Sequence, residues 1–216
     1  MTAPTPDPRR QDYDRIALAI GETCILWGLL EVLVHDIVLH LAVYLDDSFD
    51  HDRTWHVLHI ALTNMELREK IATAKALAHG VTTPDSPDLY DRTETLLNHM
   101  DNVLRSERNR YVHDYWQHDG EEIVRLKQGT RVIRPQSRQT ALYLWTARRY
   151  EGVEAIRGLV TNLEFTQLDL IDLDGHIAWL VGQKEQPGSH RQPLPPEWRS
   201  LAHRDWREPN TRPSQP

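Results

Sequence analysis

The sequence predicts a mainly α-helical protein with four main helices and a β-hairpin inserted before the last helix. Apolar residues recur at helical spacing over positions 13–115, and glycines or prolines mark most of the breaks. Residues 123–134 then change to a strand-like composition around a single glycine. We therefore expect one helical domain at positions 10–184, between a disordered lead (1–9) and a disordered Pro/Arg-rich tail (185–216).

The first predicted helix, residues 13–45, is apolar on more than one face. Such a helix has to be buried on several sides, so it packs against several other helices or against a second subunit. For this reason we expect a homodimer. Glu31, His35, Asp36 and His40 interrupt the apolar run, so the sequence predicts no membrane span.

The second and third helices are predicted at residues 54–79 and from about residue 87 to residue 115. Gly80 is well placed to end the second helix, and either Thr83-Pro84 or Ser86-Pro87 suits the start of the third. The third helix has a single apolar stripe, which consists of Leu89, Leu96, Leu97, Met100, Val103 and Leu104.

The predicted hairpin joins residues 123–127 to residues 130–134, with its turn at Gln128-Gly129. Residues 141–145 are expected to add a short third strand. Thr146 then suits the N-cap of the fourth helix, which we expect at residues 147–181.

The composition excludes several classes of protein. The net charge of −7 argues against a protein that coats nucleic acid over its whole surface, and Cys24, as the only cysteine, allows neither an intramolecular disulfide nor a cysteine-based metal site. The polar start of the chain lacks the features of a signal peptide. We expect a cytoplasmic protein without a cofactor.

The segment with the most chemical information contains Arg108, Asn109 and His113, near the end of the third predicted helix. Arginine carries a permanent, forked positive charge that suits a phosphate, and histidine exchanges protons near neutral pH. An arginine and a histidine are enough, in principle, to cleave a phosphodiester without a metal ion.

The motif resembles the Arg-x4-6-His signature of the HEPN superfamily, helical domains that include many metal-independent ribonucleases. With Tyr115 it is also similar to the Arg-x4-His-x-Tyr form of HepT-type toxins. The resemblance implies a HEPN-like helical bundle and a metal-independent endoribonuclease, acting in defence or in a toxin–antitoxin pair. It also implies that a homodimer brings two copies of Arg108 and His113 into one cleft.

The resemblance assigns a role to each residue of the motif. His113 would act as general base or acid, Arg108 would stabilise the charged transition state, and Asn109 would bind the phosphate or orient the imidazole. The resemblance would make Tyr115 the residue that a partner nucleotidyltransferase modifies, but we expect a packing role for Tyr115. For the whole protein, the alternative function is a noncatalytic HEPN-like protein that binds RNA, a nucleotide or another protein.

Residues 123–149 contain seven lysines and arginines and no acidic residue. Such a basic segment, close in the sequence to Arg108 and His113, would guide an RNA backbone towards them. The expected RNA-binding residues are Arg125, Lys127, Arg131 and Arg134. The alternative is a solvated sheet face whose basic side chains pair with acidic helices.

Several acidic residues and histidines lie close together in the first two helices, namely Glu31, His35, Asp36, His40, His56 and His59. Glu31 and His35 are one helical turn apart, a spacing that a metal ion uses in helical bundles. No paired Glu-x-x-His motif accompanies them, so the sequence predicts no metal site. A Ser/His/Asp triad cannot be recognised from sequence spacing alone.

Overall fold

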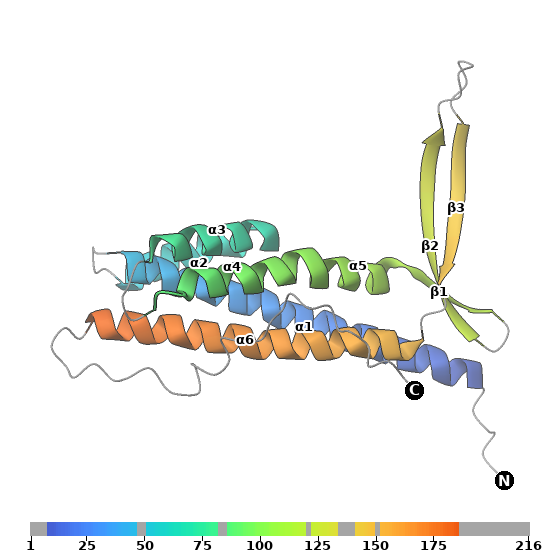
Figure 1. Ribbon diagram of the computed structural model, residues 1–216, viewed down its shortest axis with the longest axis horizontal. Coiled ribbons are helices and arrows are strands. Elements are labelled where there is room, and N and C mark those ends of the chain that lie inside the picture. The colour runs from blue at the N-terminus through green and yellow to red at the C-terminus, as the bar shows by residue number, and fades with distance from the viewer. Residues whose placement is uncertain are drawn as a thin grey trace, which may run out of the picture. The chain divides into compact units, whose positions relative to one another are not determined.

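The computed structural model describes residues 8–46, 51–81, 86–119, 122–133, 141–149 and 152–185, and in these ranges the protein is mainly helical, as the sequence predicts (Figure 1). Most of the predicted lead and tail lies outside the described residues. Two compact units share the chain. Residues 1–27 and 104–163 form the first unit, and residues 28–103 and 164–216 form the second.

The first unit contains the start of α1 (Pro8–Leu45), α5 (Arg105–His113), three strands and the start of α6 (Val153–Glu185). The strands are β1 (Tyr115–Asp119), β2 (Glu122–Ile133) and β3 (Ala141–Arg149), and they form an antiparallel sheet in the order β1-β2-β3 (Figure 1). The core of this unit contains Ile16, Ala19 and Ile156, with Tyr111, Trp116, Ile123 and other partly buried residues packed against it.

The predicted hairpin turn at Gln128-Gly129 is wrong, because β2 runs without interruption through both residues. Gln128 pairs with Thr146 of β3, and Gly129 pairs with Trp145. The first half of β2 pairs instead with β1, whose residues we expected at or just after the end of a helix. In the sequence Gly120-Glu121 separates β1 from β2, and a glycine at the first of two residues between strands is a common hairpin signal that would have indicated this pairing.

The last helix begins later than predicted, because β3 extends into the predicted start of that helix. β3 continues to Arg149, so Thr146 is a strand residue and not the predicted N-cap. α6 begins at Val153, six residues after the predicted start at residue 147, and extends to Glu185. The pairing of Thr146 with Gln128 explains the difference, because backbone groups that are used in a sheet are not available to begin a helix.

The second unit contains the rest of α1, α2 (His51–Thr63), α3 (Leu67–Gly80), α4 (Leu89–His99), nearly all of a π-helical turn (Met100–Leu104) and the rest of α6. α3 and α4 pack against each other. The core of this unit consists of fully buried apolar side chains from α1, α3, α4 and α6, among them Leu30, Val34, Ile37, Leu41, Ala74, Leu89, Leu97, Leu170, Leu173 and Ile177.

The single helix predicted at residues 54–79 is two helices. The Asn64 side chain donates a hydrogen bond to the Ile60 carbonyl at 3.2 Å, and this contact competes with continuation of the helix. The Glu69 carboxylate accepts the backbone N–H of Glu66 at 3.0 Å, which is half of a capping box and begins α3. The predicted end at Gly80 agrees with the end of α3.

The third predicted helix is also divided. α4 passes into the π-helical turn at Met100–Leu104, and α5 follows to His113. π-Helical turns are uncommon and occur frequently at functional sites. The turn immediately precedes α5, which carries Arg108, Asn109 and His113; we call these three residues the α5 motif.

α1 is long and apolar enough to cross a membrane, judged by length and composition alone. Its most apolar window has a mean hydropathy of 1.9, and 28% of that window is buried in the protein. Core helices of soluble proteins meet the same criterion, so the expected absence of a membrane span stays a prediction.

Candidate functional site

The last two turns of α5 carry all three residues of the α5 motif. His113 is the last residue of the helix, and both Asn109 and His113 are exposed. They are four residues apart, so they lie on the same side of the helix, one turn from each other. Arg108 is rotated by roughly 140° from His113 about the helix axis, and its long side chain has to reach round the helix to act beside the imidazole.

The guanidinium of Arg108 is positioned by two neighbours. Its Nη1 donates a hydrogen bond to Asn109 Oδ1 at 3.0 Å, and its central carbon lies 6.0 Å from the centre of the buried Trp27 ring. Among the residues that the structure describes, no carboxylate is paired with Arg108. Its positive charge is therefore not neutralised within this part of the chain, which favours an anionic ligand.

Asn109 makes a contact that sequence reasoning did not include. Its side-chain oxygen accepts the hydrogen bond from Arg108, so the amide orients the arginine and not the imidazole of His113. The Asn109 NH2 group can still donate to a phosphate oxygen. Sequence reasoning did not identify Trp27, because 81 positions separate it from Arg108.

Arg125, which we expected to bind RNA, is buried with only 1% of its surface exposed. Its Nη1 donates to Asp114 Oδ2 at 3.1 Å, and its guanidinium lies 5.1 Å from the centre of the Tyr111 ring. A buried, carboxylate-paired arginine is not available to an RNA backbone, so the expectation for Arg125 is corrected. Arg125 fixes Asp114, the residue between His113 and β1.

Two further contacts hold the junction between α5 and β1. The Trp116 Nε1–H donates to the carbonyl of Tyr111 at 3.2 Å, and the two rings are stacked with their centres 6.3 Å apart. The backbone N–H of Asp114 donates to the carbonyl of Arg110 at 3.2 Å. These contacts and the Arg125–Asp114 pair fix the end of α5, and hence the position of His113.

Tyr115 is the first residue of β1, and 60% of its surface is exposed. The packing role that we expected for this residue would require more burial. The side chains of Lys127 and Arg131 lie outside the described residues, as does all of Arg134. The expected RNA-binding role of these three residues therefore stays a prediction.

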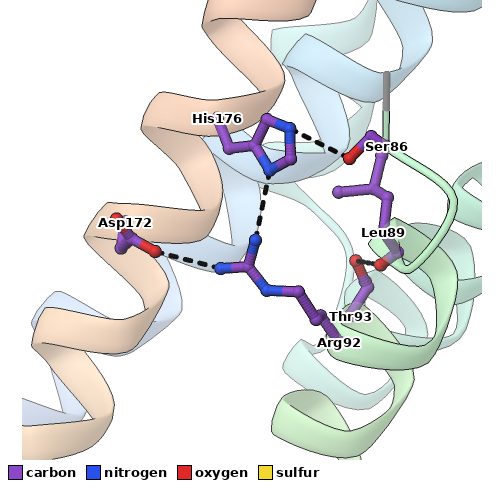
Figure 2. A network of polar contacts seen from close by, with 6 residues as sticks. All are labelled: Ser86, Leu89, Arg92, Thr93, Asp172 and His176. Atoms are coloured by element: carbon purple, nitrogen blue, oxygen red, sulfur yellow. Dashed lines mark hydrogen bonds and ion pairs between the residues drawn. The ribbon is translucent and has the colours of Figure 1, made fainter. Parts of the chain in front are cut away.

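The second unit contains a buried polar network that resembles a catalytic triad (Figure 2). Ser86 Oγ lies 2.9 Å from Nε2 of His176, and Nδ1 of His176 lies 3.2 Å from Nη1 of Arg92. The Nη2 of Arg92 donates to Asp172 Oδ2 at 3.0 Å. We call these four residues the Ser86–His176 network. These residues are separated by up to 90 positions in the chain, which explains why no sequence pattern indicated the network.

The tautomer of His176 prevents this network from acting as a triad. Arginine only donates hydrogen bonds, so Nδ1 of His176 accepts from Arg92 and the ring proton is on Nε2. That proton is donated to Ser86, so the imidazole cannot remove the serine proton as a general base does. Burial, followed by the Arg92 charge, lowers the pKa of His176 to about 4, against a smaller opposing effect of Asp88. The network therefore stabilises the fold.

Two histidines of α1, His40 and His35, also have polar partners within the second unit. His40 Nδ1 lies 2.7 Å from Asp174 Oδ1, and this hydrogen bond raises the pKa of His40 above its usual value. His35 Nε2 lies 2.9 Å from His59 Nδ1, beside a pocket of about 310 Å³. The structure thus brings together two histidines of the cluster that the sequence had suggested.

The chain matches no protein-family model, no curated protein and no solved structure. The chemistry and the geometry of its own residues therefore carry the functional argument.

Proposed function

We propose that this protein is a metal-independent endoribonuclease of HEPN type that acts through the α5 motif. The observation that carries the proposal is the environment of Arg108. It is a cation oriented by Asn109 and Trp27, without a carboxylate partner among the described residues, on the same two turns as the exposed His113. Such an arginine is suited to the negative charge of a phosphodiester.

In the proposed reaction, His113 removes the proton from a ribose 2′-hydroxyl, or donates a proton to the leaving 5′-oxygen. Arg108 stabilises the extra negative charge of the pentacoordinate phosphorus. The 2′-oxygen attacks the phosphorus and the bond to the 5′-oxygen breaks, which leaves a 2′,3′-cyclic phosphate and a 5′-hydroxyl. DNA has no 2′-hydroxyl and would not be cleaved.

We further propose that the active form is a homodimer. One imidazole cannot act as base and as acid in the same step, and a second copy would supply the second histidine. Exposed apolar side chains on the first-unit part of α1 support an interface there, since Leu18 is 64% exposed and Ile25, two helical turns further on, is 67% exposed.

The alternative function is noncatalytic binding of RNA, a nucleotide or a protein by the same surface. The exposure of Tyr115 supports a role in contact with a partner. In a toxin–antitoxin setting, that partner would be an antitoxin or a nucleotidyltransferase that modifies Tyr115. This proposal rests on the resemblance of the Arg-x4-His-x-Tyr spacing.

The test is cleavage of RNA by the purified protein in EDTA, comparing wild type with Arg108→Ala and His113→Ala. Removal of a general acid or base, or of a transition-state donor, is expected to lower the rate by about 10²–10⁴-fold. Arg157→Ala and His56→Ala are matched controls, because both residues are exposed and lie outside the motif. Cyclic phosphate ends that disappear only with the motif variants support the enzyme.

Two results would contradict the enzymatic proposal. Equal cleavage by all five proteins would identify a contaminating nuclease. Absence of cleavage, together with RNA binding that both motif variants weaken, would favour the noncatalytic alternative.

A further inference from the structure

The α1–α3 pocket, a cavity of about 310 Å³ in the second unit, is lined by residues of α1, α2 and α3. Its chemically active side chains are Glu31, His35, Asp36, His59 and Lys70. None of these residues belongs to the α5 motif. A function of this pocket would therefore be independent of the proposed ribonuclease activity.

The two histidines have the nitrogen–nitrogen separation of a pair of metal ligands. His35 Nε2 and His59 Nδ1 are 2.9 Å apart, and the ring planes meet at 69°. Two metal–nitrogen bonds of about 2.0–2.1 Å that meet at about 90–110° place their nitrogens roughly 2.9–3.4 Å apart. A metal ion could thus replace the hydrogen bond at the same nitrogen–nitrogen distance, after each ring turns so that its lone pair points at the ion.

Both imidazoles can offer a lone pair without net release of a proton. In the metal-free pair, one ring nitrogen carries the hydrogen-bonding proton and the other accepts it. On metal binding, this proton passes through solvent to the other nitrogen of the same ring.

The charges around the pair favour a cation, with one exception. Glu31 lies one helical turn before His35, and the Asp36 carboxylate interacts electrostatically with both histidines. Lys70 opposes a cation. Among the described residues no preformed group of three metal-ligating side chains exists, so the two histidines begin the site and solvent or a carboxylate completes it. A site with open positions binds less tightly than a closed structural site.

We propose that His35 and His59 bind a divalent transition-metal ion of the zinc type in the α1–α3 pocket. Imidazole nitrogen suits Zn²⁺, Cu²⁺ and Ni²⁺, and it does not suit the oxygen-preferring Ca²⁺ and Mg²⁺. The two ligands come from α1 and α2, so the ion links these two helices within the second unit.

The test is a calorimetric titration of the full-length protein with Zn²⁺ at pH 7.5. His35→Gln and His59→Gln are each expected to weaken the binding at least about tenfold, since even outer-shell losses cost about 10–100-fold. His56→Gln is the matched control, an exposed histidine on the same helix as His59, and it should bind as wild type does. Thermal melting of each variant checks that it is folded.

Lys70→Met tests the proposal without removing a ligand. Loss of this charge is expected to tighten Zn²⁺ binding by about fivefold, the order of magnitude for a unit charge and a divalent ion a few ångströms apart in a solvated pocket. No measurable binding by wild type overturns the proposal, as does equal binding by both ligand variants. If a ligand variant fails to fold, the Lys70→Met variant provides the test. A Zn²⁺ affinity of this variant equal to that of wild type would reject the site.

Discussion

The Ser86–His176 network and the α5 motif use the same residue types in opposite ways. In the network, Arg92 is paired with Asp172, and His176 is buried in its neutral form. In the motif, Arg108 has no carboxylate partner among the described residues, and His113 is exposed. An arginine that is paired with a carboxylate, next to a buried histidine, stabilises the fold. An arginine without such a partner, on the same helix as an exposed histidine, is available to a ligand.

The largest expected effect distinguishes Arg92 from Arg108. Arg92→Met removes the contacts that Arg92 makes with the buried Asp172 carboxylate and with His176 Nδ1, so it should reduce the free energy of unfolding by about 3–5 kcal/mol. Arg108→Met should change it by less than about 1 kcal/mol, because no buried polar group depends on it and methionine can still cover the Trp27 ring. Urea denaturation measures both. Equal losses for the two variants would contradict the comparison.

Arg125 sharpens the comparison within the first unit. Arg125→Met removes the buried partner of Asp114 and should destabilise the protein by about 3–5 kcal/mol, as Arg92→Met does. If Arg125 contacted RNA, as the sequence suggested, the variant would keep its stability and lose RNA affinity. Chemical denaturation together with an RNA-binding titration separates the two outcomes.

His176 should make the folded protein less stable as the pH falls. Its pKa in the folded protein, about 4, is below its usual value, so the unfolded chain binds more protons between those values. The stabilisation is therefore complete above about pH 6.5 and is lost as the pH falls, by about 3 kcal/mol at pH 4.

Urea denaturation at pH 7 and pH 5 measures this loss, with His176→Gln as the control. Glutamine can donate to Ser86 and accept from Arg92, yet it does not titrate. The pH dependence should be smaller in the variant, and an unchanged dependence would contradict the role of His176. His40 has the opposite sign, because its raised pKa gives a contribution that is lost as the pH rises through that value.

The smallest predicted effect concerns the end of α5. Trp116→Phe keeps an aromatic ring against Tyr111 and removes the hydrogen bond to its carbonyl, which should cost about 1 kcal/mol. The neighbouring exposed Tyr115 provides the control, since Tyr115→Phe should change stability by less than about 0.5 kcal/mol. Thermal unfolding measures both, and a larger loss for Tyr115→Phe would show that its ring is not at the surface.

Several helix positions could be predicted from the sequence because the signals are local. The apolar run of α1, the glycine that ends α3 and the mainly helical class follow from spacing and from the conformational preferences of single residues. The break at Asn64 was missed because the competing side-chain contacts are weak individually. The turn was placed at Gly129 because a glycine signal is local, whereas strand pairing depends on which partner strand is present.

By itself, the sequence determined the helical class and placed Arg108, Asn109 and His113 near the end of one helix. Only the tertiary structure decided which charged groups are paired. Arg125 and Arg92 have carboxylate partners supplied by other elements, and His35 meets His59 across two helices. The physical reason is that burial and charge pairing depend on residues far apart in the chain, and these determine whether a side chain stabilises the fold or remains available to a ligand.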